Sequence, residues 1–278
     1  MRKDTGFSIV ERNGVTLISV DCINRLGKYR AYYSTGWGGV SDMPGGCTMN
    51  LSLYKNCVND TFENAKENFL RFADACGFEL DRMSIHPEVH GSDIAVVRRE
   101  DIPQDVFDRK AYQPYDGQVS TDKEVALVVY AGDCNTILLA DPVHEVHAAT
   151  HCGWRNNLNG TVAHFLERFR ACGGDPETSV LAIGPSISRY YYDLDREMVE
   201  PFARAGFSDC LEKNERNGRW FIDLKEITRR QLAASGMPAD RIFIAPWCTF
   251  SSTELRLPSY RRDRGLNANL GGVLFYRQ

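Results

Sequence analysis

The sequence predicts an α+β fold in which β-sheets and helices form layers. Three observations support this prediction. The first third of the chain reads as strands, the middle reads as three strands and a helix, and no strict βαβ alternation follows. A Rossmann-type parallel sheet needs that alternation. The 278 residues suffice for one large domain or two small ones, and no linker, repeat or low-complexity tract divides them.

Strand patterns open the chain, and a helix follows. Apolar or alternating residues, with Asn13-Gly14 as a turn, predict strands over Phe7–Glu11, Val15–Asp21 and Lys28–Ser34. The segment Asp60-Thr61-Phe62-Glu63 resembles a capping box. Apolar residues then recur at helical spacing up to Cys76, and Gly77 closes the pattern, so we expect a helix between them.

The rest of the chain mixes strands and helices. Apolar runs predict strands over Glu124–Ala131, Thr136–Ala140, Glu145–Thr150, Ser179–Ile183, Arg241–Ala245 and Gly272–Tyr276. Helical spacing of apolar residues predicts three helices in this part of the chain. The first begins at Asn156 and ends at Gly173-Gly174, and the other two cover Asp195–Ala205 and Asp223–Ala234.

Composition narrows the class of protein. The net charge of −4 and the pI of 5.9 argue against a dedicated nucleic-acid binder. No apolar run resembles a signal peptide or approaches the ~18 residues of a membrane span, so we expect a cytoplasmic protein. The nine cysteines are odd in number and form no C-x-x-C pair. We therefore expect reduced thiols rather than a disulfide framework or a zinc ribbon.

The six histidines all lie between residues 86 and 164. His164 sits beside the apolar face of a helix and is expected to be structural, and His144 and His147 are expected to be surface or turn residues. His151 differs because it lies where an apolar strand ends in His151-Cys152-Gly153-Trp154-Arg155, just before a helix. Glycine at such a turn permits close backbone approach, and a helix N-terminus favours anions.

Two further residues lie at strand boundaries, namely Cys134 and His90. Together with His151 they form a plausible three-ligand zinc set with an open fourth position. Their spacing matches no local finger, so folding has to bring them together; buried core residues are the alternative. Cys152 should point to the opposite face of its strand and pack in the core.

Charged and polar residues near these positions are candidates for binding or proton transfer. Arg155, Arg261 and Arg262 are the cationic candidates, the last two with a solvated loop as the alternative. Asp133 could orient a ligand, act as a general base or cap a turn. Asn50 follows a glycine-rich stretch and is a weak signal by itself.

These residues occur in an ordered series of motifs that resembles a known family. The matches are Gly39-Val40-Ser41 with Asn50-Leu51, Val89-His90-Gly91, Gly132-Asp133-Cys134, Leu139-Ala140-Asp141-Pro142, Ala149-Thr150-His151-Cys152-Gly153-Trp154-Arg155, Ile183-Gly184-Pro185, and Cys248-Thr249 followed by Ser259-Tyr260-Arg261-Arg262. They resemble the YfiH/LACC1 family of laccase-domain proteins, once called multicopper polyphenol oxidases. The family is now regarded as zinc-dependent purine nucleoside enzymes.

The resemblance implies a fold, a site and an activity. It implies a single α+β domain over residues 1–278 with a β-sandwich-like core, and zinc held by His90, Cys134 and His151, although Cu²⁺ is possible. The implied reactions are phosphorolysis of adenosine, inosine and guanosine, cleavage of methylthioadenosine, and deamination of adenosine. Asp133 would carry protons, while Asn50, Arg155 and Arg261 would bind substrate. The expected partners are purine nucleosides and phosphate, without nucleic acid or membrane, in a monomer or small homo-oligomer.

Three departures from the family pattern bear on the activity. Gly36 stands where the family usually has arginine, Asn156 where it has glycine and Cys152 where it has alanine. If the missing arginine holds phosphate, Arg155 or Arg261 has to compensate.

Three other functions remain open. A copper-dependent phenol oxidase of the conventional laccase type needs about ten histidines, more than this chain has. A metal-free hydrolase would use Cys134 as nucleophile and His90 or His151 as base. The third alternative is a binding protein without catalysis.

Overall fold

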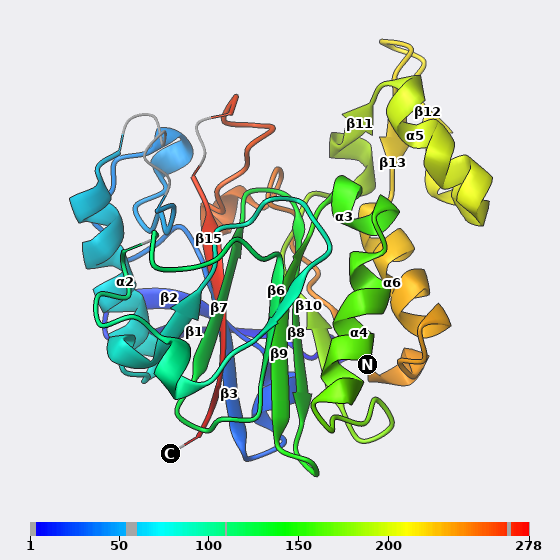
Figure 1. Cartoon of the computed structure of the whole chain (residues 1–278). Coiled ribbons are helices and arrows are strands. Elements are labelled where there is room, and N and C mark those ends of the chain that lie inside the picture. Colours follow the sequence, from blue (N-terminus) through cyan, green and yellow to red (C-terminus); the bar gives the residue numbers. More distant parts are fainter. Residues whose placement is uncertain (1–3, 54–59, 109, 266–267, 278) are drawn as a thin grey trace.

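Two six-stranded sheets face each other in the computed structural model, which describes residues 4–53, 60–108, 110–265 and 268–277 (Figure 1). The first sheet has, in spatial order, β1 (Ser8–Arg12), β2 (Val15–Ser19), β3 (Tyr29–Ser34), β15 (Leu270–Tyr276), β7 (Ala126–Ala131) and β4 (Met83–Ile85). The second has β14 (Ile242–Ile244), β10 (Val180–Ile183), β8 (Asn135–Asp141), β9 (Val146–Cys152), β6 (Gly117–Ser120) and β5 (Ile94–Val96).

The main core lies between the two sheets. Successive side chains of β8 point to opposite faces of the second sheet and pack in two different apolar layers. Leu138 packs in the layer against the first sheet, whereas Ile137 and Leu139 pack in the layer against the helices. Two buried tyrosines of β3 also bridge the sheets, because the hydroxyls of Tyr29 and Tyr33 donate to carbonyl oxygens at the two ends of β8. The sandwich-like layering expected from the sequence is therefore confirmed.

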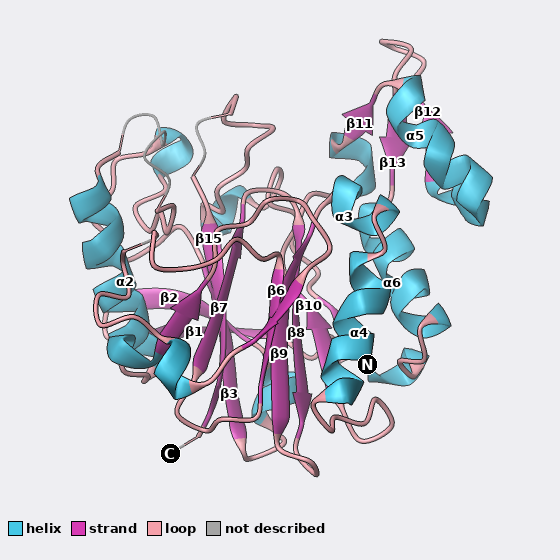
Figure 2. Cartoon of the chain, viewed as in Figure 1, coloured by secondary structure: helices cyan, strands magenta, loops and turns pink. Residues whose placement is uncertain are grey.

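Helices cover the outer faces of both sheets (Figure 2). Helix α2 (Phe62–Cys76) packs on the first sheet, and α4 (Thr161–Ala171) and α6 (Leu224–Ala234) pack on the second. The shorter α3 (Trp154–Leu158) directly follows β9, and α1 (Asp21–Asn24) follows β2. None of the helices in the described ranges has the length and apolar character that crossing a membrane requires.

A small lobe projects beyond one end of the sheets. It comprises residues 189–223, with β11 (Asp193–Leu194), β13 (Trp220–Ile222) and β12 (Leu211–Lys213) in one three-stranded sheet, and α5 (Arg196–Phe202) against it (Figure 1). An apolar cluster that includes Phe202 and Ile222 from the lobe and Ile227 from α6 anchors it. The lobe thus stands on the helical side of the second sheet.

The predicted elements are largely present, with corrections at their ends. The predicted strands and helices are all found, but the helix expected from Asn156 begins at Trp154 and is interrupted because Gly160 adopts φ +79°. The helix expected over Asp195–Ala205 is α-helical over Arg196–Phe202 and continues as a π-helix over Ala203–Phe207. The N-cap of α2 is Thr61, whose hydroxyl accepts from the Asn64 amide, so the capping position lies one residue later than the motif suggested. Strands β4, β5, β6 and those of the small lobe were not predicted.

Candidate metal centre

Two neighbouring strands place the first two members of the candidate site. Strands β8 and β9 are antiparallel, and the pairing of Asn135 with Cys152 sets Cys134 opposite Gly153. A Cβ atom on Gly153 would lie 2.9 Å from Cys134 Sγ, so only glycine fits without displacing the thiol. His151 lies on the same strand end, and its side chain points to the face opposite Cys152, which is fully buried among core residues as expected.

The loop before β5 supplies the third member. His90 adopts a left-handed backbone (φ +59°) and its ring lies 4.9 Å from that of His151, at an angle of 75°. Ligand atoms of His90, Cys134 and His151 all lie within 4.8 Å of one another. Histidine, cysteine, aspartate and glutamate side chains could hold a metal ion wherever three or more of them converge. Among the described residues, His90, Cys134 and His151 are the one such group.

The donor set fits a zinc ion. Zn–N distances of about 2.0–2.1 Å and a Zn–S distance of about 2.3 Å would place these tetrahedral ligand atoms roughly 3.3–3.6 Å apart. The three ligand atoms lie within 4.8 Å of one another, so zinc binding would need only a small inward movement of the side chains. His151 is buried, whereas His90 and Cys134 are partly exposed, so a metal ion held by the three would be accessible to solvent or substrate. Three protein ligands with one open position are typical of catalytic rather than structural zinc sites.

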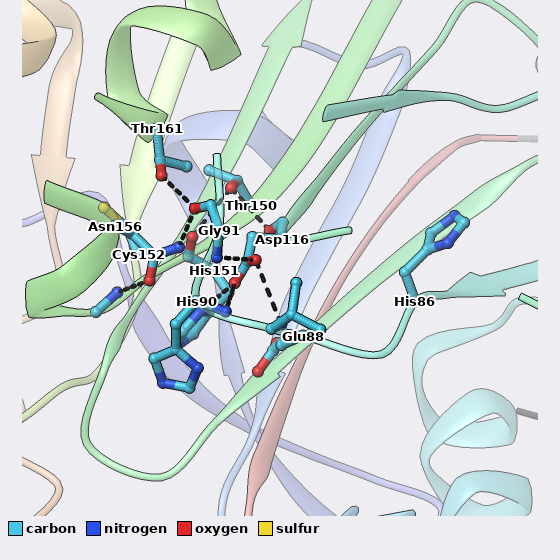
Figure 3. A network of polar contacts seen from close by, with 12 residues as sticks. His86, Glu88, His90, Gly91, Asp116, Thr150, His151, Cys152, Asn156 and Thr161 are labelled. Atoms are coloured by element: carbon cyan, nitrogen blue, oxygen red, sulfur yellow. Dashed lines mark hydrogen bonds and ion pairs between the residues drawn. The ribbon is translucent and has the colours of Figure 1, made fainter. Parts of the chain in front are cut away.

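Asp116, which sequence analysis missed, forms hydrogen bonds to two of the three residues, His90 and His151 (Figure 3). Its Oδ1 accepts a hydrogen bond from His151 Nδ1 at 3.0 Å, which leaves Nε2 as the ligand atom. The same carboxylate accepts the backbone N–H groups of His90 and Gly91 at 2.9 and 2.7 Å. Asp116 belongs to no recognisable motif, and the strand that follows it, β6, was itself not predicted.

The ionisation of the site follows from burial and charge. Burial by itself raises the pKa of Asp116, but the hydrogen bonds from His151 and Gly91 outweigh it and hold the pKa below its ordinary value. Burial lowers the pKa of His151, but the nearby Glu88 and Cys134 and the bond to Asp116 outweigh it and raise the pKa well above the ordinary value. A metal ion binds neutral imidazole, so binding here would release a proton.

Asp133 adjoins the thiol and connects it to distant loops. The residue adopts φ +87°, and its buried carboxylate accepts from the Thr249 hydroxyl at 2.5 Å and from the Arg261 backbone N–H at 2.7 Å. Burial raises its pKa above the ordinary value despite these hydrogen bonds. Asp133 therefore fixes the segments of Thr249 and Arg261 beside Cys134, and its role as a proton carrier stays a prediction.

The candidate arginines differ in what they contact. Arg155 is exposed, with its guanidinium 4.3 Å from the ring centre of Trp154, and no acidic side chain of the described residues pairs with it. Arg261 forms an ion pair with Asp193 of the small lobe at 2.8 Å. Arg262 is committed to its own loop, donating to Asp263 and to the carbonyl oxygens of Thr249 and Leu257. Arg155 is thus the freest of the three to meet an anion.

Asn50 lies in a different network. It is fully buried; its amide nitrogen donates to Asp60, and its carbonyl oxygen accepts the N–H groups of Ser52 and Asn269. These bonds connect the start of β15 to the N-terminal end of α2. The contacts do not bring Asn50 to the three candidate ligands, and its role in substrate binding stays a prediction.

An aromatic groove of about 610 Å³ opens between the small lobe and the loop that carries Phe250. Its lining residues are Tyr190, Tyr191, Asp193, Asn214, Arg216, Phe221, Phe250 and Arg261. Tyr191 and Phe250 stack, with ring centres 4.7 Å apart and planes at 18°. Arg261 is the lining residue that connects the groove to the candidate site, because its backbone N–H donates to Asp133, the residue before Cys134.

The other histidines lie elsewhere, and one expectation about them is wrong. His147 is not a surface residue: it is buried in β9, its Nε2 lies 3.0 Å from the Val125 carbonyl, and burial lowers its pKa to about 4. The strand continues through this position, so the side chain faces the space between the sheets. His144 is a turn residue paired with Asp141 at 2.8 Å, as expected. His164 lies exposed on α4, 3.4 Å from the Ser92 carbonyl.

Comparison with known proteins places the chain in a family. A model of the family described as multi-copper polyphenol oxidoreductase laccase matches residues 30–274. The chain belongs to this family. The match includes all three candidate ligands, Asp116 and the arginines of the site.

Two named relatives and a solved structure are similar to this chain over most of its length and of their own. The purine nucleoside phosphorylase YlmD of Geobacillus stearothermophilus is 29% identical over 241 residues, covering 85% of this chain and 86% of that protein. Adenosine deaminase RL5, from an unknown prokaryotic organism, is 27% identical over 244 residues, covering 84% and 92%. The crystal structure of the Geobacillus YlmD superposes with a TM-score of 0.87 at 26% identity, covering 98% and 99% of the two chains.

The departure at Gly36 has a structural counterpart. A Cβ atom at this position would lie 2.0 Å from the Arg256 carbonyl oxygen, so no side chain fits there without moving that backbone. The Arg256 guanidinium instead lies 3.5 Å from the ring centre of Trp37 and donates to the Gly46 carbonyl. The arginine that the family resemblance leads us to expect at position 36 would therefore require this backbone to move.

Proposed function

We propose that this chain is a zinc-dependent purine nucleoside enzyme that phosphorolyses adenosine, inosine, guanosine and methylthioadenosine and deaminates adenosine. The observation that carries the proposal is the His90–Cys134–His151 cluster, which has the donor atoms and the open side of a catalytic zinc site. The names of the two relatives, a purine nucleoside phosphorylase and an adenosine deaminase, support the choice of substrate.

The two reactions place different demands on the site. In phosphorolysis a phosphate oxygen bonds to the ribose C1′ while the bond from C1′ to the base nitrogen breaks, and the departing base takes the electron pair and a proton. In deamination the oxygen of water replaces the 6-amino group of adenine, and ammonia leaves. When bound, zinc supplies Lewis-acid chemistry for either reaction.

Side chains around the cluster would bind phosphate and move the proton. Arg155 offers an exposed guanidinium that no acidic side chain among the described residues pairs with, and its planar donors match two phosphate oxygens. Arg261 would take part only after its pairing with Asp193 loosens. Asp133 would hold the proton, since burial raises its pKa and it directly precedes Cys134.

The aromatic groove would hold the purine base. Its volume of about 610 Å³ suits a nucleoside, and the exposed faces of Tyr190 and Tyr191 are stacking surfaces that any purine can use. Arg261 lines the groove and its backbone N–H donates to Asp133, which precedes Cys134, so the groove and the cluster share this connection.

A direct assay tests this proposal. The purified chain, analysed for bound metals, is incubated with adenosine, inosine and guanosine with and without phosphate. We expect free base and ribose 1-phosphate only when phosphate is present, and inosine from adenosine in both conditions. If neither product forms with the zinc-loaded chain, the proposed function is wrong.

Copper-dependent oxidation of phenols is the second candidate, because it is what the description of the family states. His86, His144, His147 and His164 all lie outside the cluster and hydrogen-bond to other groups. Two histidines and one cysteine then remain, far fewer ligands than a conventional laccase needs. Copper content together with phenol-dependent oxygen consumption would favour this candidate over the first.

A further inference from the structure

The geometry points to Asp116 as the positioning residue for the metal site, holding two of its three ligands in place before a metal ion binds. This inference rests on the metal site of the proposed function but not on the reaction. Asp116 is 3% exposed and lies at the start of β6, beside β9. Neither the sequence motifs nor the family resemblance assigns it a role.

Asp116 holds His151 by two hydrogen bonds and the preceding residue, Thr150, by a third. The side-chain Oδ1 accepts from His151 Nδ1 at 3.0 Å, and the backbone carbonyl accepts the His151 N–H at 2.7 Å. The same carbonyl accepts the Thr150 hydroxyl at 2.9 Å. A carboxylate only accepts, so Nδ1 carries the proton and Nε2 presents its lone pair to the cluster. The ring can neither flip nor change tautomer without losing this bond.

The same carboxylate shapes the loop of His90. Three consecutive backbone N–H groups, those of Val89, His90 and Gly91, point to its two oxygens at 3.3, 2.9 and 2.7 Å. His90 has φ +59°, a conformation that a non-glycine residue adopts only when its surroundings enforce it. The three hydrogen bonds to Asp116 hold this backbone conformation from one side of the loop.

Asn156 clamps the other side of the loop. Its Nδ2 donates to the Gly91 carbonyl at 2.8 Å, and its Oδ1 accepts the Gly153 N–H at 2.9 Å (Figure 3). Thr161 donates to the same Gly91 carbonyl at 2.7 Å. Asn156 stands where the family usually has glycine, so this chain adds a side-chain clamp that the usual residue cannot make.

The consequence is a metal site whose ligands are already oriented. Removing a carboxylate that orients a ligating histidine typically weakens metal binding 10- to 100-fold. Here the loss of zinc affinity should fall in the upper half of that range, because the one carboxylate orients the ring of His151 and also holds the backbone of His90. A purely structural role would lower stability but leave the affinity for zinc unchanged.

The test compares Asp116→Asn with Asp141→Asn. Asp141 is a matched control because its fully buried carboxylate also accepts backbone N–H groups and pairs with a histidine, His144, at 2.8 Å, but at the other end of β8 and β9. Zinc affinity of the whole stripped chain is measured by competition with a chromophoric chelator, and Tm is measured with and without zinc. No nucleoside is needed.

We expect both variants to lower Tm, but only Asp116→Asn to weaken zinc binding, by about 30- to 100-fold, and to shrink the zinc-induced rise in Tm. An unchanged affinity in Asp116→Asn, or an equal loss in Asp141→Asn, would overturn the inference. If Asp116→Asn does not fold, Asp116→Glu serves instead: it keeps the charge but moves the carboxylate out of register with His151 Nδ1 and the loop N–H groups, so zinc binding should again weaken by about 10-fold or more, and an unchanged affinity would likewise overturn the inference.

The outcomes separate this inference from the proposed function. If the native chain binds zinc and the variants behave as expected but nucleosides are not converted, the inference stands and the proposed function fails. If the native chain does not bind zinc, both fail.

Discussion

Arg261 Nη1 lies 2.8 Å from Asp193 Oδ1, which connects the loop beside the candidate metal site to the small lobe. The same carboxylate also pairs with Arg219 at 3.2 Å and accepts from Asn217 at 2.7 Å. Partial burial by itself raises the pKa of Asp193, but the hydrogen bond from Asn217 and the charges of Arg219 and Arg261 outweigh it and hold the pKa below its ordinary value. An anion that approaches Arg261 therefore competes with the Asp193 carboxylate for the Arg261 guanidinium.

Asp193→Asn should release Arg261 for phosphate. Removing the competing charge is expected to lower the phosphate KM of phosphorolysis by about 3- to 10-fold, since a partner lost from a partly buried ion pair is worth on the order of 1 kcal/mol. The nucleoside KM should change less. Glu212→Gln, at a lobe carboxylate that pairs with Arg189, is the control. A rise in the phosphate KM would mean that Asp193 orients Arg261 rather than competing for it.

Cys134→Ala should remove metal and turnover together. Two histidines alone are a poor zinc site, so zinc measured by elemental analysis should fall to a small fraction of one ion per chain. Cys152→Ala is the matched control, because this neighbouring thiol is buried on the opposite face; we expect it to keep zinc and lose about 1 kcal/mol of stability.

The same experiment addresses the metal-free alternative. If Cys134→Ala retains zinc, the ligand assignment is refuted. If the native chain works in the presence of a strong chelator and a thiol reagent labels Cys134, the cysteine acts as a nucleophile instead.

Tyr191→Ala should weaken nucleoside binding through the aromatic groove. Stacking of a base on an aromatic ring is worth about 1–3 kcal/mol, so we expect the nucleoside KM to rise roughly 10-fold while the phosphate KM stays constant. Phe62→Ala, at an exposed aromatic residue on α2 outside the groove, should change neither value. An unchanged nucleoside KM in Tyr191→Ala would place the base elsewhere.

His147 should make stability depend on pH. Its pKa is about 4 in the folded chain against about 6.5 when unfolded, so the unfolded state binds the proton first as the pH falls. Its contribution is complete above pH 6.5 and is lost as the pH falls from there to 4, at a cost of roughly 3 kcal/mol.

His147→Gln can keep the hydrogen bond to the Val125 carbonyl without titrating. We expect its free energy of unfolding, measured with urea from pH 7 to pH 4, to fall less steeply than that of the native chain. Parallel curves would show that His147 does not titrate in this window.

Local patterns predicted most elements close to their observed ends. Helix α2 was found because its apolar face and its terminal Gly77 are both visible in a short window of sequence. Strands β4, β5 and β6 were missed because they have three or four residues and little alternation. The break at Gly160 was missed because one glycine also occurs within helices.

The sequence by itself determined the layered α+β fold, the family and the three residues that could bind a metal ion, because hydrophobic periodicity and motif order are local properties of the chain. Only the tertiary structure revealed Asp116, which reaches His90 and His151 from 26 and 35 residues away. It also decided that Arg261 pairs with Asp193, whereas Arg155 has no acidic partner in the part of the chain that the structure describes. Such partners are set by which strands and loops become neighbours, and a single buried aspartate leaves no periodic trace in the sequence.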